Sequence, residues 1–386
     1  MIGSRRLRRP NAALLLTAIL ALALSGCASD KPKIPDLVWP PAPETPRIKY
    51  IGSISSQVEI EKFSILRWLK EALFGADPKA RMGKPYAVAV DAKGRMLVAD
   101  SAWGKIMVFD REKGEFSLLG LSGPGALNKP LGVTLDSQGR IYATDSFQNR
   151  VVVYDKDENF LLAMGEKGRF DQPVGIAVNE TLGRVYVVDA RKHNVSVFDM
   201  EGNFLFEFGG RGADDGQFNF PTNLAVSKRS GTVAVMDSFN FRVQLFNPDG
   251  KFIRKFGGAG TALGHFSRPK GIGFDSEDHI YVVDAAFNNV QIFDLEGRLL
   301  LFFGQMGTGP AEFWLPAGLA IDPLDRIYVV DQYNRKVHIF QYLKSSTPID
   351  SSPPQSVPST EPVPMEPVPA QPPVEPPVEP GPLPNG

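Results

Sequence analysis

The sequence predicts an all-β fold, a six-bladed β-propeller built from four-stranded blades. The main support is one pattern that occurs six times: a proline, a short apolar strand, an apolar run closed by aspartate, and a strand that ends in Phe or Tyr. The closing aspartates lie 44 to 48 residues apart, a period typical of propellers and solenoids. The repeats show no helical periodicity, which excludes a helical solenoid. The six aspartates are Asp100, Asp145, Asp189, Asp237, Asp284 and Asp331.

Each repeat contains enough sequence for four strands. The best-preserved copy places them at 269–275, 280–284, 289–294 and 297–304, and the hairpin signal Glu296-Gly297 separates the third from the fourth. The second strand of this copy is continuously apolar rather than alternating. Such a strand is covered on both faces, and neighbouring blades stacked face to face would cover it.

The number of strands predicts how the ring closes. Six copies of the first three strands are present, but the last copy stops at residue 342 without a fourth strand. Residues 47–52, upstream of the first copy, have the composition of the missing outer strand. We therefore expect this segment to pair with the last blade in a 1+3 closure, because an open ring would expose long unpaired strand edges.

The repeats resemble NHL repeats over nearly all of 84–342. The matching segments are the start at 173–178, the apolar run with its aspartate at 185–189, the third strand at 240–246 and the glycine-rich segment at 208–218. The resemblance implies the same propeller fold. WD40 repeats are disfavoured because no Trp-Asp dipeptide occurs, and kelch repeats because the double glycines follow the fourth strand.

The N-terminus has the pattern of a lipoprotein signal peptide over 1–27. Four arginines precede an apolar run at 12–24, which is too short to span a bilayer. The following Leu24-Ser25-Gly26-Cys27 resembles a lipobox, which implies cleavage before Cys27 and diacylation of its thiol. Cys27 is also the only cysteine. The alternative is an ordinary secretory signal that happens to be followed by cysteine.

The same segment predicts location and charge. Ala28, rather than Asp, follows Cys27, so the resemblance to sorted lipoproteins favours the outer membrane of a bacterial cell envelope. Without the four arginines of the leader, 38 basic residues stand against 43 acidic ones, a net charge near −5. This balance does not suggest a nucleic-acid partner.

Three segments outside the repeats complete the expected domain organisation. Residues 28–46 are rich in proline and are expected to form a spacer before a propeller domain at 47–344. Residues 63–74 carry apolar side chains at helical spacing and predict a helical insertion, which either packs on the propeller or contacts a membrane or partner. Residues 345–386 contain 15 prolines, five acids and no basic residue, and predict a disordered tail.

A candidate binding face is predicted at one end of the propeller. There, the loops between second and third strands carry five aromatic residues and several basic ones. Trp, Tyr and Arg dominate binding hot spots, although the basic residues belong to the repeat and could instead brace the turns. The candidates are Trp103, Phe147, Phe239, Phe287 and Tyr333 with Arg150, Arg242, Arg335 and Lys336, together with Lys105.

Signals for catalysis are weak. The four histidines, His193, His265, His279 and His338, fall at four different repeat positions without zinc spacing. Residues 155–166 imitate a calcium loop, but Phe160 stands where that loop needs glycine. The sequence contains no serine nucleophile elbow. We therefore predict no catalytic residue, no metal site and no cofactor.

Together these features favour a lipid-anchored envelope protein that is not an enzyme. Its propeller would act as a binding or scaffolding module for an envelope protein, a peptide or a glycan, and Cys27 would hold it to the membrane. The alternative, implied by resemblance to propeller enzymes, is a metal-dependent lyase or lactone hydrolase with its site in the central channel.

Overall fold

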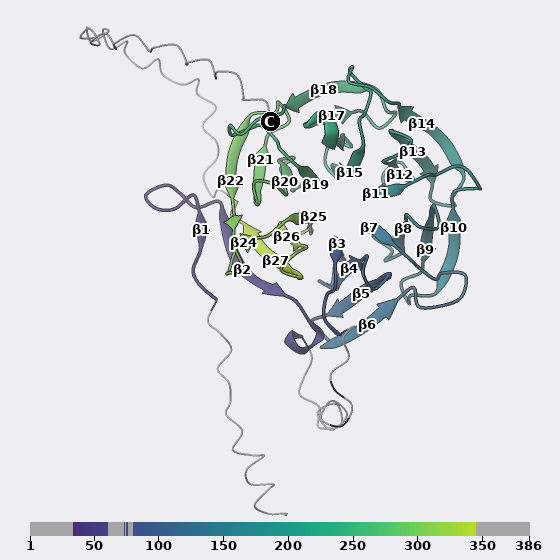
Figure 1. Ribbon diagram of the computed structural model, residues 1–386, viewed down its shortest axis with the longest axis horizontal. Coiled ribbons are helices and arrows are strands. Elements are labelled where there is room, and N and C mark those ends of the chain that lie inside the picture. The colour runs from purple at the N-terminus through teal and green to yellow at the C-terminus, as the bar shows by residue number, and fades with distance from the viewer. Residues whose placement is uncertain (1–33, 61–72, 74, 76–79, 345–386) are drawn as a thin grey trace, which may run out of the picture. The chain divides into compact units, whose positions relative to one another are not determined.

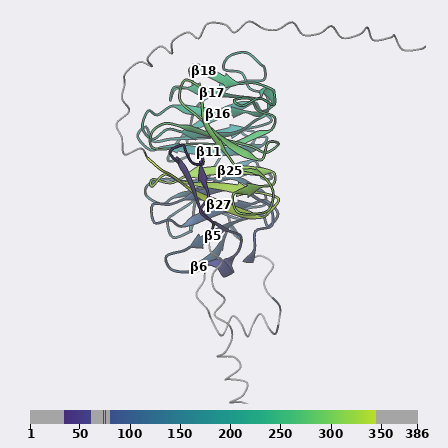
Figure 2. The same cartoon turned by 90° about the vertical axis from the view of Figure 1, so that its left-hand side faces the viewer.

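The computed structural model describes residues 34–60, 73, 75 and 80–344. In this part of the chain, six antiparallel sheets form blades around a central axis, with the first strand of each sheet innermost (Figure 1). Figure 2 shows the same ring from the side. The predicted all-β, six-bladed propeller is therefore confirmed. Among the described residues, no helix is long and apolar enough to cross a membrane.

Blades 1 to 3 each consist of four consecutive strands. Blade 1 contains β3 (Pro85–Val90), β4 (Met96–Asp100), β5 (Lys105–Asp110) and β6 (Glu115–Leu119). Blade 2 contains β7 (Pro130–Leu135), β8 (Ile141–Asp145), β9 (Arg150–Tyr154) and β10 (Phe160–Met164). Blade 3 contains β11 (Pro173–Asn179), β12 (Arg184–Asp189), β13 (Asn194–Asp199) and β14 (Phe204–Gly209).

Blades 4 and 5 repeat this arrangement, and blade 6 differs in its outer strand. Blade 4 contains β15 (Pro221–Val226), β16 (Val233–Asp237), β17 (Arg242–Phe246) and β18 (Phe252–Gly257). Blade 5 contains β19 (Pro269–Phe274), β20 (Ile280–Asp284), β21 (Asn289–Phe293) and β22 (Leu299–Phe303). Blade 6 contains β25 (Pro316–Ile321), β26 (Arg326–Asp331), β27 (Lys336–Tyr342) and β2 (Ile48–Ile54). The short elements are β1 (Val38–Trp39), β23 (Gln305–Met306), β24 (Glu312–Phe313), η1 (Gln57–Glu59) and η3 (Ser238–Asn240).

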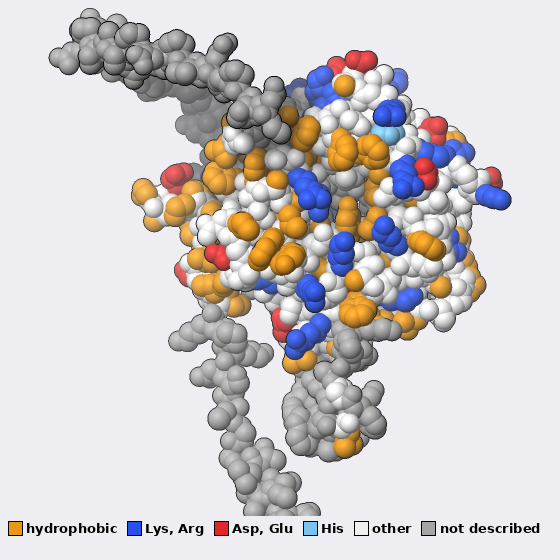
Figure 3. All heavy atoms as spheres, viewed as in Figure 1, with side chains coloured by type: hydrophobic (Ala, Val, Ile, Leu, Met, Phe, Trp, Pro, Cys, Tyr) orange, Lys and Arg blue, Asp and Glu red, His pale blue; other side chains and the backbone are white. Residues whose placement is uncertain are grey.

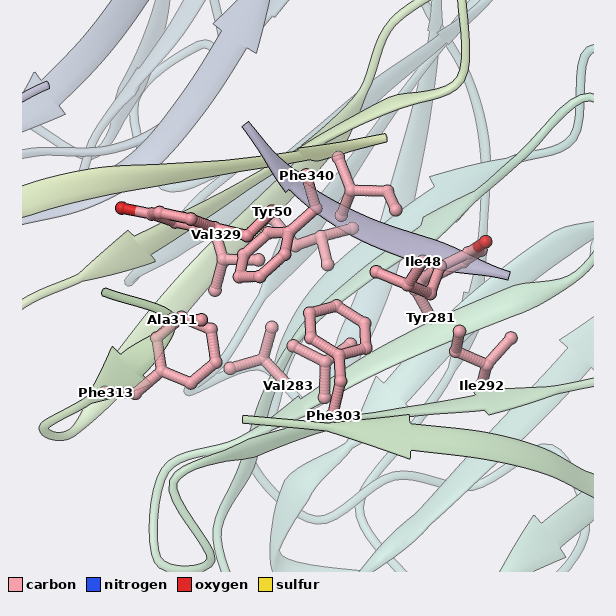
Figure 4. Close-up of a cluster of buried hydrophobic side chains, with 13 residues drawn as sticks. Ile48, Tyr50, Tyr281, Val283, Ile292, Phe303, Ala311, Phe313, Val329 and Phe340 are labelled. Atoms are coloured by element: carbon pink, nitrogen blue, oxygen red, sulfur yellow. The ribbon is translucent and has the colours of Figure 1, made fainter. Parts of the chain in front are cut away.

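The N-terminal strand β2 closes the ring by pairing with β27. Its register places Tyr50 opposite Phe340 and Ile54 opposite Val337. Ile48 and Tyr50 join an apolar cluster with side chains of blades 5 and 6, including Phe303 (Figure 4). The 1+3 closure is thus confirmed, and its stability comes from packing between blades as well as from the strand ladder.

The segment before β2 differs from the expected spacer. Within the predicted spacer at 28–46, Val38 and Trp39 form β1, which adds a fifth strand to blade 6 by pairing with β2. The Trp39 ring lies 5.9 Å from Phe303 and 6.0 Å from Phe340. Proline richness suggested a free spacer, but it does not prevent an apolar Val-Trp pair from packing on a sheet. The leader with Cys27, nearly all of the predicted helix at 63–74 and the tail at 345–386 lie outside the described residues.

The repeated aspartate holds two loops of its blade together. Asp284 is fully buried, and its carboxylate accepts hydrogen bonds from the amides of Ser267 and Arg268 in the loop that enters blade 5. It also accepts the amides of Ala286 and Phe287 in the loop after β20. A buried carboxylate needs such donors, and here they fix two loops at once. This aspartate therefore has a structural role in its repeat.

Adjacent first strands pack backbone to backbone near their starts. A Cβ atom on Gly132 would lie 2.1 Å from the carbonyl oxygen of Val174, and one on Gly271 would lie 2.5 Å from that of Ala317. Gly175 and Gly318 occupy the same repeat position and are similarly confined. The glycine of the Pro-x-Gly start is therefore required by the close approach of neighbouring blades.

Candidate binding face

The first strands all run in the same direction, so the propeller has two distinct faces. We call top face the one formed by the loops that enter each first strand and the loops between second and third strands. The bottom face is formed by the other two sets of hairpin loops. All nine predicted binding residues belong to loops or strand starts of the top face.

The predicted aromatic residues differ in exposure. Phe147, Phe239 and Tyr333 are 70%, 60% and 57% exposed, which is unusual for large apolar side chains. Trp103 and Phe287 are only partly exposed. The Trp103 indole donates a hydrogen bond to the carbonyl of Arg81 and is therefore part of the loop structure. Three of the five candidates are thus free to contact a partner.

Three of the four predicted basic residues brace loops. Arg150 donates to the carbonyl oxygen of Ala126, and Lys336 donates to that of Thr308. Arg242 bonds the carbonyls of Ala213, Asp214 and Gln217 and forms an ion pair with Asp237. Lys105 makes the corresponding contacts in blade 1. Only Arg335 is exposed.

Two further aromatic residues extend this surface. Trp314 stacks on Tyr333, with ring centroids 4.2 Å apart and planes inclined by 29°. Phe220 packs on Phe239 at 5.0 Å. Trp314 and Phe220 belong to loops that enter first strands. The aromatic candidates predicted from the sequence were all residues of the loops between second and third strands. Each pair combines one residue from each loop type of its blade.

A second group of cations, also missed from the sequence, lies at the starts of the first strands. Lys84, Lys129 and Arg268 are exposed and directly precede the repeat prolines. Lys270 lies two residues further along β19, with its Nζ 6.0 Å from the centroid of the Tyr86 ring. Burial, assisted by the charges of Arg268 and Lys84, lowers the pKa of Lys270 to about 8. Burial also raises the pKa of Tyr86.

The two faces carry different charge. In the described top-face loops, ten Lys and Arg residues stand against six Asp and Glu residues. The bottom-face loops contain ten basic and sixteen acidic residues. Figure 3 views the ring along its axis and shows Lys and Arg side chains around the centre of one face. The top face is therefore the more positively charged of the two.

The largest described cavity lies in the central channel, toward the bottom face. It has a volume of about 470 Å³ and is lined by the lower parts of the six first strands, with Lys228 and Glu180 among the charged residues. Its lining begins at the third or fourth residue of these strands. Tyr86, Leu131 and Val174, the second residues of their strands, belong to one apolar cluster. The cavity is thus separate from the predicted face, although its size is typical of ligand sites.

Two of the carboxylates at this cavity, Asp275 and Asp322, are held by their own hairpins. Asp275 accepts the amides of Glu277 and His279 and the hydroxyl of Tyr281, and it bonds the His279 ring. Asp322 is engaged in the same way by its own hairpin. Among the described residues, no three His, Cys, Asp or Glu side chains come together in a group that could hold a metal ion.

The histidines play separate structural roles. His279 is hydrogen-bonded to Asp275, which raises the pKa of its ring. His338 is fully buried in β27, and burial lowers its pKa. His193 accepts the amide of Phe220 and packs against its ring. No two of these histidines share a partner.

Comparison with known families identifies the repeat. Residues 170–198 match the NHL repeat, and residues 266–350 match a family described as a 6-bladed beta-propeller. No curated protein matches the chain in sequence.

Solved structures show the same fold at low identity. A protein of unknown function from Bacteroides thetaiotaomicron has a TM-score of 0.55 at 17% identity, covering 75% of either chain. A gluconolactonase from Xanthomonas campestris gives 0.53 at 17% identity, over 76% of this chain and 98% of that one. Virginiamycin B lyase from Staphylococcus aureus gives 0.51 at 16% identity, over 67% of this chain and 95% of that one. At these identities the likeness extends to the fold alone.

Proposed function

This chain is a six-bladed β-propeller with NHL repeats, and we propose that it is a lipid-anchored bacterial envelope protein that binds another envelope protein through its top face. The observation that carries this proposal is the set of exposed aromatic side chains on that face. Phe147, Phe239 and Tyr333 are each more than half exposed, and the last two are supported by Phe220 and Trp314.

Their fixed positions support a role in binding. The loops that carry Phe147 and Phe287 are held to buried aspartates through backbone amides. Tyr333 donates its amide to the carbonyl of Trp314, and Phe239 donates to that of Asn219. Rigid aromatic side chains lose little entropy on binding and often form the centre of protein interfaces.

The membrane anchor follows from the leader. A diacylated Cys27 would provide two acyl chains, enough for stable attachment, and Ala28 after it favours the outer membrane. Of the three partner classes expected from the sequence, a protein fits this face best. Exposed aromatic residues of this kind are enriched in protein interfaces.

The test is crosslinking in cells, followed by purification of the lipidated chain from envelope fractions. The variant combines Phe147→Ala, Phe239→Ala and Tyr333→Ala. The control combines Leu182→Ala and Leu324→Ala, two exposed apolar residues of the bottom face. We expect the first variant to lose its main crosslinked protein and the control to keep it. Retention of the partner by both would overturn the proposal.

The alternative function, a metal-dependent lyase or lactone hydrolase, would use the channel cavity. Only the cavity volume and the fold of the structural neighbours favour it. Metal analysis of the same purified protein separates the two functions. A stoichiometric metal in a preparation without a partner would favour the enzyme.

A further inference from the structure

Three cations meet at the centre of the top face. Lys270 of blade 5 lies near the Tyr86 ring of blade 1, so the two side chains approach each other across the start of blade 6. Arg268 and Lys84, which precede the same two strands, are close enough for their charges to affect Lys270. We call Lys84, Arg268 and Lys270 the axial cation cluster.

The side chains of the axial cation cluster are not ion-paired within the described part of the chain. None of its three members forms an ion pair with a described residue, whereas Arg95, Arg140 and Arg326 of the bottom face are each paired with an aspartate. Like charges held together without anions disfavour the charged state and the fold. An anion that joined them would remove this repulsion.

The backbone under the cluster is fixed before any ligand arrives. The amides of Lys84 and Arg268 donate to the buried carboxylates of Asp100 and Asp284. The Lys270 carbonyl accepts a hydrogen bond from the Thr222 hydroxyl. Sites held in this way need little rearrangement to bind.

An aromatic pair borders the cluster. The side chain of Gln332, next to Tyr333, donates to the carbonyl of Pro85, which lies between Lys84 and Tyr86. The stacked Trp314 and Tyr333 rings of blade 6 therefore lie beside the start of β3. The centre of the face offers positive charge and an exposed aromatic surface next to each other.

We propose that the axial cation cluster binds the carboxylates of an acidic segment of the partner protein, while the Trp314–Tyr333 pair packs on an apolar side chain of that segment. This rests on the proposed function and adds the chemistry of the partner. Aromatic and arginine side chains together are typical of protein interfaces, and three cations on a face without a described cavity match several carboxylates better than one small anion.

The site is tested with the purified full chain and a fluorescent peptide of ten glutamates, by fluorescence anisotropy. The test variant combines Lys84→Gln, Arg268→Gln and Lys270→Gln. The matched control combines Lys93→Gln, Lys228→Gln and Arg229→Gln, which removes three exposed cations from the bottom face and changes the net charge equally. We expect about a 10-fold loss of affinity in the test variant and less than about a 2-fold loss in the control.

Competitors identify the class of ligand. Inorganic phosphate and polygalacturonate, matched in charge concentration, should displace the peptide less well than unlabelled peptide does. Equal losses in both variants would overturn the site, and better displacement by either competitor would overturn the assignment to an acidic protein. As a second readout, the amine of Lys270 is followed by NMR after reductive methylation. Its pKa should rise when the peptide binds, because carboxylates favour the charged amine.

Crosslinking in cells separates this proposal from the proposed function. If the aromatic variant loses the partner and the cation variant keeps it, the axial site is wrong and the proposed function stands. If the aromatic variant keeps the partner, the proposed function fails, whatever the peptide result. Loss of the partner in both variants supports both.

Discussion

At the scale of single residues, the buried aspartate of each repeat fixes the positions of the top-face loops. Asp145 accepts amides from Asn128 and Lys129 on one side and from Phe147 and Gln148 on the other. One carboxylate thus fixes a cation and an aromatic residue of the top face. Its loss would leave several amide groups without acceptors, each of which costs free energy when buried.

We expect Asp145→Ala to lower the free energy of unfolding by about 3 kcal/mol, because it leaves these amides unpaired. Chemical denaturation measures this change. Asp157→Ala is the control, since this exposed carboxylate pairs only with Lys156 and accepts no amide of another loop. Unfolding midpoints that are equal for the two variants would contradict the proposed role of Asp145.

Lys270 is expected to lower the free energy of unfolding while it contributes to the proposed binding site. Its folded pKa of about 8 lies below its ordinary value of 10.5, so the unfolded chain binds more protons between these pH values. Stability from this group therefore rises as pH increases from about 8 to 10.5 and is lowest below pH 8. We expect Lys270→Met to stabilise the fold at pH 7 by about 1 kcal/mol, discounted for the partial exposure of the amine.

Thermal unfolding from pH 7 to 10.5 measures the difference in stability between the Lys270→Met variant and the parent chain. This difference should fall to nearly zero at the upper end, where the lysine is neutral in the folded state and half neutral in the unfolded chain. Lys251→Met on the bottom face provides the comparison for loss of an exposed lysine. A parent chain that is more stable than Lys270→Met at pH 7 would show that the cluster is not strained.

The sequence and the structure disagree most at the scale of the residue. Arg150, Arg242 and Lys336 were predicted as binding residues because they face the same end as the aromatics, but their side chains reach loop carbonyls. Lys84 and Arg268 were not predicted as binding residues, because they lie before prolines in irregular loops. Repeat position indicates which face a residue occupies, but side-chain direction depends on partners in the neighbouring loop.

At the scale of the element, the first strands determine how closely the blades pack. Gly132 of β7 faces the backbone of β11, and its amide donates to Thr144, whose hydroxyl donates to Val174. We expect Gly132→Ala to lower the free energy of unfolding by about 2 kcal/mol, because the added methyl group forces two backbones apart. The control Gly258→Ala, where the nearest atom is 3.5 Å from the added Cβ, should change it little. Similar denaturation midpoints for both variants would refute the packing argument.

The closing strand β2 is the other element on which the ring depends. Tyr50 is 4% exposed and lies 5.4 Å from Phe340, ring to ring. We expect Tyr50→Ala to cost about 3 kcal/mol, because it removes a large side chain from between blades 5 and 6. Lys49→Ala, on the exposed side of the same strand, is the control. If calorimetry gives both variants the same melting temperature, β2 does not hold the ring closed through this cluster.

Elements were predictable because each repeat presents the same pattern six times. The strand count predicted the outer strand at 47–52, and the structure extends it to Ile54. The short β1 was not predictable, since two residues in a proline-rich segment carry no periodic signal. Its packing depends on Phe303 and Phe340, which are distant in the sequence.

At the scale of the whole molecule, basic and acidic residues are distributed unequally between the two faces, although the net charge is near zero. The chain from Cys27 to residue 344 is neutral, with 38 basic and 38 acidic residues, while the described top-face loops alone contain ten basic and six acidic residues. Net charge gave no reason to expect a nucleic-acid partner, but it concealed the basic face. Only the arrangement of the loops around the ring reveals it.

The proposed attachment through Cys27 would limit where the top face can act. Leu37 already packs on the propeller, so nine residues separate it from Cys27 and span at most about 30 Å. This is shorter than the predicted spacer would allow. The proposed partner must therefore lie close to the membrane surface.

The anchor itself gives the last prediction. We expect Cys27→Ser to move the chain from the membrane to the soluble fraction of the envelope, because two acyl chains provide nearly all of its membrane affinity. Fractionation before and after detergent extraction measures this shift. Ser25→Ala, two residues earlier, leaves the cysteine in place and should stay in the membrane fraction. A Cys27→Ser chain that remains membrane-bound, together with a crosslinked partner, would mean that the partner rather than a lipid holds the propeller at the membrane.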